Sequence, residues 1–572
     1  MLSTLFFYVL ITGTCLWTGY FFCYFIGKKA AEADEKNGVV LAIWGMILMS
    51  GAAQVAELFI PVHQASWLVW VLLLIVVSVF CKKVWLLFTE RLRRSFYRNK
   101  HLLLPVCVTG LLISVLGAGP LMMDDTESYH IQCIKWIQEW GTVPGLANLH
   151  ERYGFNSGWF AFAALFIPRH TVHNYYTLAN GVFSVWISVY LLQAAFPIRQ
   201  EAGRTGSLPL ACFAVLVTAL FCWPMIRGNA ATANYDFVTA GLVVVGLIEL
   251  IRLTQTGRHW KSLLPEGVVW PFFLFTVRII NFPLLLFSLL TLVYLIRSKS
   301  YRLVIPCLLL AAGLVVPFLI RNVLLSGFIL FPAYQIDLFS VDWKADPALT
   351  KELVHYIKYF NRINNVFLPI RETARLRFAD WFPLWFRYLS LAEKLVLTGG
   401  LAGYGRWIMQ QKGGGRPVPV LQFFASIVLL QLFSWFLVAP DPRFVYGPLL
   451  AGIFLLFYST SGPRLQAYYL KGQMLLQNSL LLVLLAYTLV KFALSKDYRQ
   501  PLQPIAVPVP ITRTVWVDSI RLQIPQKLGT NWNARCYATG LPCLYKLDPR
   551  LRARGKGIRA GFTIQKRLRL IP

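Results

Sequence analysis

The sequence predicts an all-α integral membrane protein that crosses the bilayer many times, and three observations support this fold class. Hydrophobic residues make up 57% of the 572-residue chain, charged residues only 14%, and the mean hydropathy is +0.57. Apolar runs long enough to cross about 30 Å of hydrocarbon recur along the chain. Lys and Arg residues collect in the short segments between these runs, as in cytoplasmic loops. Composition alone excludes a soluble globular class.

The apolar runs give about 14 candidate membrane spans. The first run lacks a basic start and a small-residue cleavage site, so we expect an anchor and not a removed signal peptide. The longer candidates lie at 5–25, 39–60, 66–81, 102–123, 175–196, 208–225, 235–251, 303–320, 389–408, 418–438 and 474–493, and the shorter ones at 267–280, 282–296 and 445–459.

The basic segment Lys82–Lys100 fixes the predicted orientation, because such segments stay in the cytoplasm. The run 158–167 is too short to span, and we expect it to lie at the outer interface. Every later basic segment then falls inside: 199–204, 252–261, 297–302, 406–416 and 464–471. The outer face carries the loops 124–174 and 322–388, the turn 227–235, the corner 439–444 and the tail.

This frame divides the chain into three parts. Residues 1–101 form additional N-terminal transmembrane helices, 102–493 form the main transmembrane module, and 494–572 form a soluble, basic tail outside. Cys536 and Cys543 lie close together in that tail, and an oxidising compartment would let them pair. A zinc site is less favoured there, since no His or further Cys is near. The chain has no Asn-x-Ser/Thr sequon, which favours a bacterial plasma membrane with a periplasmic outer face.

A cluster of ionisable residues follows the run 102–123 and reads Asp124-Asp125-Thr126-Glu127-Ser128-Tyr129-His130. Carboxylates at the edge of a bilayer are costly to desolvate, so they do chemistry, bind ions or reach water. Apolar residues at helical spacing in 131–140 predict an amphipathic helix on the membrane surface, which ends at Gly141-Thr142-Val143-Pro144-Gly145.

These motifs resemble the first outer loop of the GT-C class of membrane glycosyltransferases. Asp124-Asp125-x-x-x-Tyr129, a helix and Trp140-Gly141-x-Val143-Pro144 are similar to the pattern in protein mannosyltransferases and aminoarabinose transferases. Asp236, Arg278 between two half-length helices, and Arg443 before Tyr446 and Pro448 match weaker points of that pattern. The chain differs in its three preceding spans, in Asp125 where Glu is usual, and in Arg278 where Lys is usual. The segment 145–157 and the cysteine-containing tail resemble a bacterial branch of large GT-C-like proteins.

The resemblance implies a GT-C-like fold whose first outer loop is catalytic. It also implies an inverting glycosyltransferase that uses a polyprenyl-phosphate-linked sugar and a glycan, lipid or protein acceptor. Asp124 would act as the base, and Asp125 or Asp236 would position the acceptor. Arg278, Arg443 and Arg321 would bind the donor phosphate. Tyr129, His130, His150 and Arg152 are possible substrate contacts.

Each of these residues has a structural alternative. The acidic pair could be a solvated helix end, Asp236 a favourable charge at a helix N-terminus, and Arg278 half of a buried pair. Arg321 and Arg443 could be interfacial snorkelling residues. We predict no metal and no other cofactor, although the carboxylates leave a divalent ion open. Membrane lipids are expected partners. Nucleic acid is not expected, because the basic residues do not follow one amphipathic stripe.

Three other function classes remain open at this stage. A glycan polymerase or ligase would concentrate its functional Arg residues in one large outer loop. A lipid-linked glycan flippase needs no base. A solute transporter would show internal repeats, and none is visible in the pattern.

Overall fold

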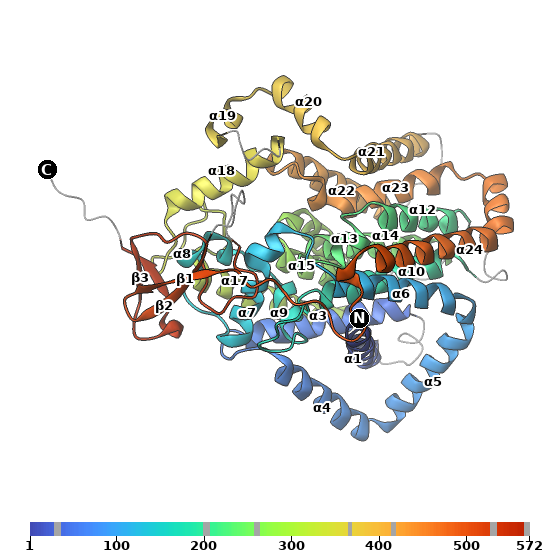
Figure 1. The fold of residues 1–572 in the computed structure, drawn as a ribbon. Helices are drawn as coiled ribbons and strands as arrows, with labels where there is room; N and C mark the ends of the chain where they lie inside the picture. Colours follow the sequence, from blue (N-terminus) through green and yellow to red (C-terminus); the bar gives the residue numbers. More distant parts are fainter. Residues whose placement is uncertain are drawn as a thin grey trace.

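The computed structural model describes residues 1–27, 36–197, 206–256, 264–363, 369–412, 419–526 and 535–565 (Figure 1). Among these residues, nine helices are long and apolar enough to cross a membrane, or ten if one bent pair counts as a single span. Two shorter apolar helices lie at Leu208–Phe221 and Pro265–Val277. The all-α polytopic class is therefore supported, while the count of about 14 spans stays a prediction.

The longer helices include the candidate membrane spans of the described residues. In chain order they are α1 (Leu2–Gly27), α3 (Gly38–Ala56), α4 (Gln64–Phe80), α5 (Lys82–Arg98), α6 (Leu103–Ala118), α10 (Leu178–Ala195), α12 (Leu208–Phe221), α14 (Asp236–Thr256), α15 (Leu264–Val277), α16 (Leu285–Arg297), α17 (Tyr301–Ser326), α21 (Leu391–Lys412), α22 (Pro419–Val438), α23 (Tyr446–Thr460) and α24 (Pro463–Leu494).

Shorter elements connect these helices. They are η1 (Lys100–Leu102), η2 (Thr126–His130), α7 (Ile131–Glu139), α8 (Leu146–Leu149), η3 (Glu151–Gly154), α9 (Gly158–Ala164), α13 (Ile226–Asn229), η5 (Ile279–Leu284), α18 (Pro347–Ile363), α19 (Ile370–Arg375), α20 (Phe378–Tyr388), η6 (Pro442–Val445), η7 (Lys496–Tyr498), β1 (Thr512–Val517), β2 (Ile520–Pro525), β3 (Leu551–Ala553), η8 (Ile558–Ala560) and β4 (Phe562–Ile564).

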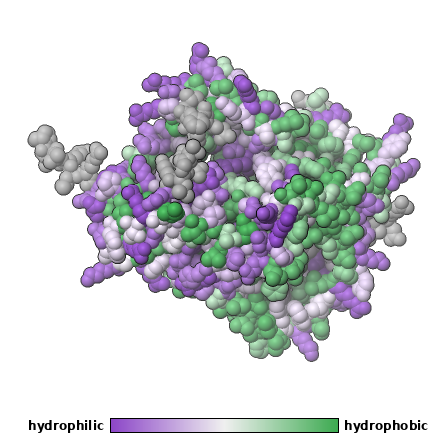
Figure 2. All heavy atoms as spheres, viewed as in Figure 1, coloured by the Kyte–Doolittle hydropathy of each residue, from purple (hydrophilic) through white to green (hydrophobic). Residues whose placement is uncertain are grey.

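The surface is divided into an apolar and a polar part. Figure 2 shows hydrophobic residues gathered over the part of the molecule that holds α4 and α24, and hydrophilic residues over the part that holds the strands. The helix α24 carries exposed Leu475, Leu482 and Leu489, which water would not favour. We infer that the apolar part faces lipid.

Close helix contact at α21 and α23 holds the outer corner before α23 in place. A Cβ atom at Gly403 would lie 1.8 Å from the carbonyl oxygen of Gly452, so only glycine fits there. A Cβ atom at Gly452 would likewise lie 2.2 Å from the carbonyl oxygen of Gly400. Small residues of this kind let membrane helices approach backbone to backbone.

The predicted cytoplasmic loop Lys82–Lys100 is mostly a helix, which corrects the sequence analysis. Helix α5 is bent by 107° from α4. Its Val84 and Phe88 are buried while Lys82 and Lys83 are exposed, so one face packs against the protein and these two lysines lie at the surface. Similarly, the predicted basic loop 464–471 lies inside α24. The basic positions Arg199, Arg204, Arg258, Lys261 and Arg416 lie outside the described residues.

The two segments predicted at the outer interface are buried inside the protein. Every residue of α9 is buried, and Ser50 of α3 donates a hydrogen bond to its Gly158 carbonyl at 2.7 Å. Residues 131–138 of α7 are also buried, including the polar Gln132 and Lys135. The amphipathic pattern was read correctly as a helix, but protein and not lipid covers it.

Part of the cover of α7 comes from the C-terminal tail, to which Gln132 and Lys135 donate hydrogen bonds. The tail contains the antiparallel hairpin β1–β2 and the short antiparallel pair β3–β4, which lie beside α8 in Figure 1. The amide of Phe562 donates to the Pro144 carbonyl at 3.0 Å, and the chain's N-terminal ammonium donates to Gln500 at 3.0 Å. The tail therefore folds back over the first outer loop and returns to the start of the chain.

Candidate functional site

A cavity of about 690 Å³ lies at the end of the helices that carries the acidic loop 124–130. Its walls come from segments far apart in the chain. They are the first outer loop, the start of α14, the break between α15 and α16, helices α18 and α20 of the second outer loop, and the corner 438–446. Phe282, Tyr388 and Val438 line it and are also largely exposed, so its rim is partly apolar.

The acidic pair is split by the fold between two positions. Asp125 turns into the cavity, where its side chain is 18% exposed, and Arg152 binds one carboxylate oxygen at 2.8 Å. Arg443 binds the other oxygen at 3.2 Å. Asp124 lies at the cavity mouth with its side chain 66% exposed and pairs with Arg535 of the tail at 2.8 Å.

The two guanidiniums control the charge of Asp125. Burial alone would raise the pKa of this carboxyl, but Arg443 and Arg152 hold the pKa below its ordinary value. Asp125 is therefore ionised and weakly basic at neutral pH. It is suited to fixing the two arginines and poorly suited to accepting a proton.

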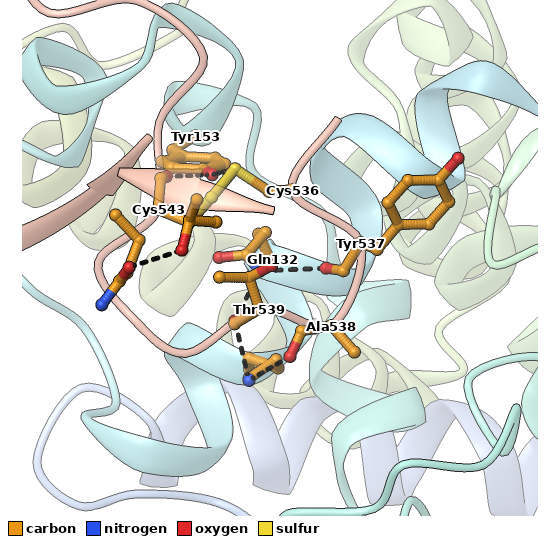
Figure 3. The surroundings of a disulfide bond; sticks show 10 residues. Gln132, Tyr153, Cys536, Tyr537, Ala538, Thr539 and Cys543 are labelled. Atoms are coloured by element: carbon orange, nitrogen blue, oxygen red, sulfur yellow. Dashed lines mark hydrogen bonds between the residues drawn. A yellow bond between two sulfur atoms is a disulfide. The ribbon is translucent and has the colours of Figure 1, made fainter. Parts of the chain in front are cut away.

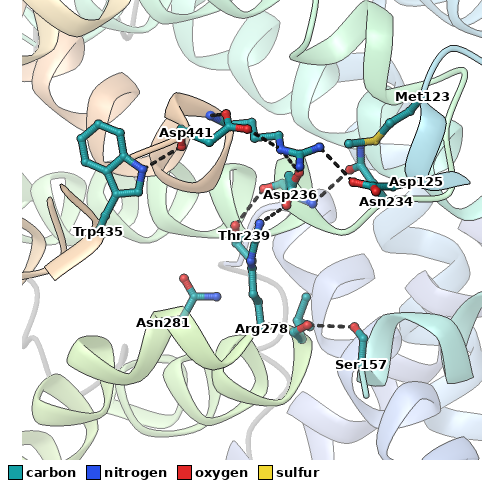
Figure 4. Close-up of polar contacts among 12 residues, drawn as sticks. Met123, Asp125, Ser157, Asn234, Asp236, Thr239, Arg278, Asn281, Trp435 and Asp441 are labelled. Carbon is teal, nitrogen blue, oxygen red and sulfur yellow. Dashed lines mark hydrogen bonds and ion pairs between the residues drawn. The ribbon is translucent and has the colours of Figure 1, made fainter. Parts of the chain in front are cut away.

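Arg278 lies where the helix is broken. It follows α15, and η5 separates it from α16, so the sequence-predicted half-helices are present. Ser157 donates to the carbonyl of Val277, which the break leaves without a helical partner (Figure 4). Asn281 adds a second donor to the Leu274 carbonyl, which also accepts from the Arg278 amide. Arg278 ion-pairs with Asp236 and lies 3.6 Å from the Phe444 ring centroid.

Arg443 joins the other charges together. Its side chain reaches Asp441 at 2.9 Å and Asp236 at 3.9 Å, in addition to Asp125 (Figure 4). Asp441 accepts a hydrogen bond from the Arg443 amide at 3.0 Å and so caps η6. Three cations and three carboxylates thus alternate along one wall of the cavity.

Tyr129 and His130 line the same cavity. Burial lowers the pKa of His130 to about 3, although Asp125 opposes the shift, so the imidazole is neutral. It shares a hydrogen bond of 3.2 Å with Thr126. Burial also raises the pKa of Tyr129, whose ring lies 5.4 Å from the guanidinium carbon of Arg152. Both residues can contact a substrate, and neither is charged there.

Two predicted site residues lie elsewhere. Arg321 does not line the cavity, because its guanidinium pairs with the buried Glu57 at 3.3 Å and with Asn156. His150 lies beside the rings of Tyr153 and Tyr545, and its Nδ1 accepts a hydrogen bond from the Arg152 amide at 3.1 Å. The structure therefore brings together Asp125, Asp236, Arg152, Arg278 and Arg443, with Asp124 at the mouth, and gives Arg321 and His150 packing roles.

Three charged residues at or beside the cavity were missed from the sequence. Glu393 lines the cavity and accepts a hydrogen bond from the Tyr446 hydroxyl at 3.4 Å. Asp441 lies in Pro440-Asp441-Pro442-Arg443, and a carboxylate two residues before an expected phosphate ligand at a helix start was a usable signal. Arg535 gave no such signal, because nothing local connects the tail to the acidic pair.

The described residues contain no group of three or more His, Cys, Asp or Glu side chains that could hold a metal ion. The carboxylates of the cavity are separated from one another by arginines, as the ion pairs show. These ion pairs therefore determine which charged groups a substrate in the cavity can reach.

Comparison with known proteins gives one match. A family model described as a domain of unknown function (DUF8201) matches residues 1–450, which is most of the chain and includes every cavity segment. No curated protein and no solved structure matches the chain.

Proposed function

We propose that this chain, which belongs to the DUF8201 family, is an inverting glycosyltransferase of the GT-C type. It would move a sugar from a polyprenyl-phosphate-linked donor to a glycan, lipid or protein acceptor at the outer face of a bacterial plasma membrane. One observation carries this proposal. A single cavity at the outer end of apolar helices holds carboxylates and three arginines, which four separate segments contribute.

The arginines suit an anionic leaving group. Arg278 and Arg443 each present a guanidinium to the cavity wall, and a guanidinium can bind a phosphate through two parallel hydrogen bonds. Their present partner Asp236 is shared by both, so a phosphate would compete with one carboxylate for two cations. The break before η5 leaves Arg278 between two half-length helices, an arrangement that suits a cation for the phosphate of a membrane-embedded lipid.

The apolar rim suits the lipid part of such a donor. Phe282 at the break and Val438 at the end of α22 are 49% and 54% exposed and also line the cavity. A prenyl chain could leave the cavity over these side chains into the bilayer while the sugar and phosphate stay inside. A soluble sugar nucleotide would gain nothing from this apolar exit.

The reaction needs one base and no covalent intermediate. The acceptor oxygen attacks the anomeric carbon and forms the new glycosidic bond, while the bond from that carbon to the phosphate oxygen breaks. The phosphate keeps the bonding electrons, and the guanidiniums stabilise its added charge. A carboxylate takes the proton of the acceptor hydroxyl.

We assign Asp124 as that base. It lies at the cavity mouth, where an acceptor arrives from the outer side, and its ion-pair partner in the described structure is Arg535 alone. Asp125, bound by Arg152 and Arg443, instead positions the phosphate-binding arginines. Replacing Asp124 should therefore affect turnover, whereas replacing Asp125 should affect donor binding.

The test uses the purified full chain in lipid with a panel of radiolabelled polyprenyl-phosphate sugars. Asp124→Asn should lower turnover by about a hundredfold or more and leave donor binding unchanged, because it removes the base alone. Asp125→Asn should weaken donor binding, because it releases Arg152 and Arg443. The matched control is Asp342→Asn, since Asp342 also pairs with a tail arginine, Arg554, but lies outside the cavity lining.

Equal turnover in Asp124→Asn and Asp342→Asn would remove Asp124 from the chemistry. Donor binding without sugar transfer by the unaltered chain would instead favour a flippase, which needs no base. If the chain binds none of the donors, the proposal is contradicted and a transporter becomes the favoured class.

A further inference from the structure

The C-terminal tail contributes a charged residue to the cavity mouth. Arg535 pairs with Asp124 at 2.8 Å and also with Glu127, so one guanidinium bridges two carboxylates of the acidic loop. Without this bridge, the two carboxylates would repel each other across one helical turn. The tail lies outside residues 1–450, the part of the chain that the family model matches.

A set of hydrogen bonds holds the segment after Arg535 against α7 (Figure 3). Gln132 donates to the carbonyls of Tyr537 and Thr539, both at 2.9 Å. Lys135 donates to the carbonyls of Ala538 and Thr539, also both at 2.9 Å. These are two buried polar side chains that the membrane-facing pattern of α7 left unexplained. Their partners are backbone groups, so the contact specifies the path of the tail.

The backbone of the acidic loop takes part as well. The amide of Tyr537 donates to the carbonyl of Glu127 at 2.7 Å, inside the π-helical turn η2. A π-helical turn leaves carbonyl groups without the usual helical partner, and here a tail amide supplies one. Arg535 and Tyr537 therefore bind the same turn, one through side chains and the other through the backbone.

A disulfide closes the tail segment that makes these contacts. Cys536 and Cys543 are joined, as the sequence predicted, and both are buried. Tyr153 of the first outer loop donates to the carbonyl of Cys543 at 2.6 Å (Figure 3). Because the bond is buried, it stabilises the loop and is poorly placed to respond to reductants in solution.

We propose that Arg535 is a positioning residue, which fixes the Asp124 carboxylate at the cavity mouth, and that the disulfide loop 535–543 is part of the site. The role of Asp124 rests on the proposed function, whereas the docking of the loop does not. Arg535 does not touch the reacting atoms. It acts through Asp124 and Glu127, whose orientation it sets.

The first test measures whether the loop 535–543 is docked on the first outer loop, and it needs no activity assay. Hydrogen exchange of residues 126–139 is compared in lipid between the unaltered chain, Arg535→Gln and Arg554→Gln. Arg554 is the matched control, because it is a tail arginine that pairs with Asp342 of the other outer loop. Arg535→Gln should raise exchange in 126–139 by about tenfold, and Arg554→Gln should not. Equal exchange in the two variants would overturn the proposal.

The second test measures whether Arg535 positions Asp124 for the reaction. With a polyprenyl-phosphate sugar that the unaltered chain uses, Arg535→Gln should lower kcat by about tenfold or more and leave donor affinity unchanged. Arg535→Lys should restore part of kcat, because it returns the charge with the rest of the loop intact. A merely structural role would lower the amount of folded enzyme and spare kcat per folded molecule, and that result would overturn the positioning role.

A third variant covers the case in which Arg535→Gln fails to fold. Cys536→Ser with Cys543→Ser keeps Arg535 but opens the loop, and exchange in 126–139 should rise as it does in Arg535→Gln. Unchanged exchange in this double variant would show that the loop does not hold η2. If the unaltered chain transfers no sugar, the proposed function fails, and the exchange results alone decide the docking.

Discussion

At the scale of single residues, the same residue type has different roles that only its partners reveal. Arg278, Arg321 and Arg443 all follow or interrupt apolar runs, and the sequence predicts one phosphate-binding role for the three. The structure gives Arg278 and Arg443 to the cavity and pairs Arg321 with Glu57, whose side chain is fully buried. Whether each arginine binds substrate or only supports the packing of the protein therefore depends on which carboxylate lies nearest to it.

This division gives a prediction for Arg321. Arg321→Met should lower the free energy of unfolding by about 3 kcal/mol, because it leaves the buried Glu57 without its cation. Donor binding per folded molecule should not change. Thermal unfolding in detergent and donor binding measure the two effects.

Adding Glu57→Gln to Arg321→Met should recover part of the stability, since the unpaired charge is then gone. A loss of donor binding without a loss of stability would return Arg321 to the phosphate site and contradict this interpretation.

At the scale of elements, polar side chains keep the irregular backbone of the site in place. The break between α15 and α16 interrupts the helical hydrogen bonds, and backbone groups within a membrane bundle need partners from the protein. Asn281 donates to the Leu274 carbonyl at 3.0 Å and accepts from Gln431 of α22 at 2.8 Å. One buried amide therefore fixes the break that presents Arg278 to the cavity.

We predict that Asn281→Leu loosens this break. It leaves the buried Gln431 amide without its partner, at about 1–3 kcal/mol, and removes the side-chain bond to the Leu274 carbonyl, which keeps its bond from the Arg278 amide. Donor affinity should fall as well, because Arg278 loses its fixed backbone. Unfolding and donor binding are compared with those of Ser288→Ala, a control in α16 whose hydroxyl donates to the Val268 carbonyl away from the cavity. Equal donor affinity in the two variants would separate Asn281 from the site.

At the scale of the whole molecule, topology decides which compartment the cavity faces. Helix α5 and the cavity belong to opposite sides of the membrane in the proposed frame, because the basic face of α5 carries the cytoplasmic signal. The hydrophilic part of the surface in Figure 2 lies over the tail strands that Figure 1 labels.

Two introduced cysteines test this frame in intact bacteria. A membrane-impermeant maleimide should label Asp342→Cys directly and should label Lys83→Cys only after the membrane is opened. Both positions are exposed, and the unaltered chain serves as the control for the native cysteines. Direct labelling at position 83 and not at 342 would place the cavity in the cytoplasm and contradict the proposed outer-face reaction.

Local patterns in the sequence determined several features by themselves. Apolar runs and their basic flanks predicted a helical membrane protein, and short half-runs around Arg278 predicted the broken helix. The spacing of Cys536 and Cys543 predicted their disulfide. The acidic pair was singled out because a carboxylate next to an apolar run is costly to keep there.

Only the tertiary structure decided what each of these features contacts. The sequence predicted that 131–140 and 158–167 lie against lipid, but protein covers both, because an apolar face does not specify whether lipid or protein buries it. It also could not place Arg535 on Asp124, since more than four hundred residues of chain separate them. Long-range contacts of this kind leave no local pattern, so the charges that define the cavity were settled by the packing of the whole chain.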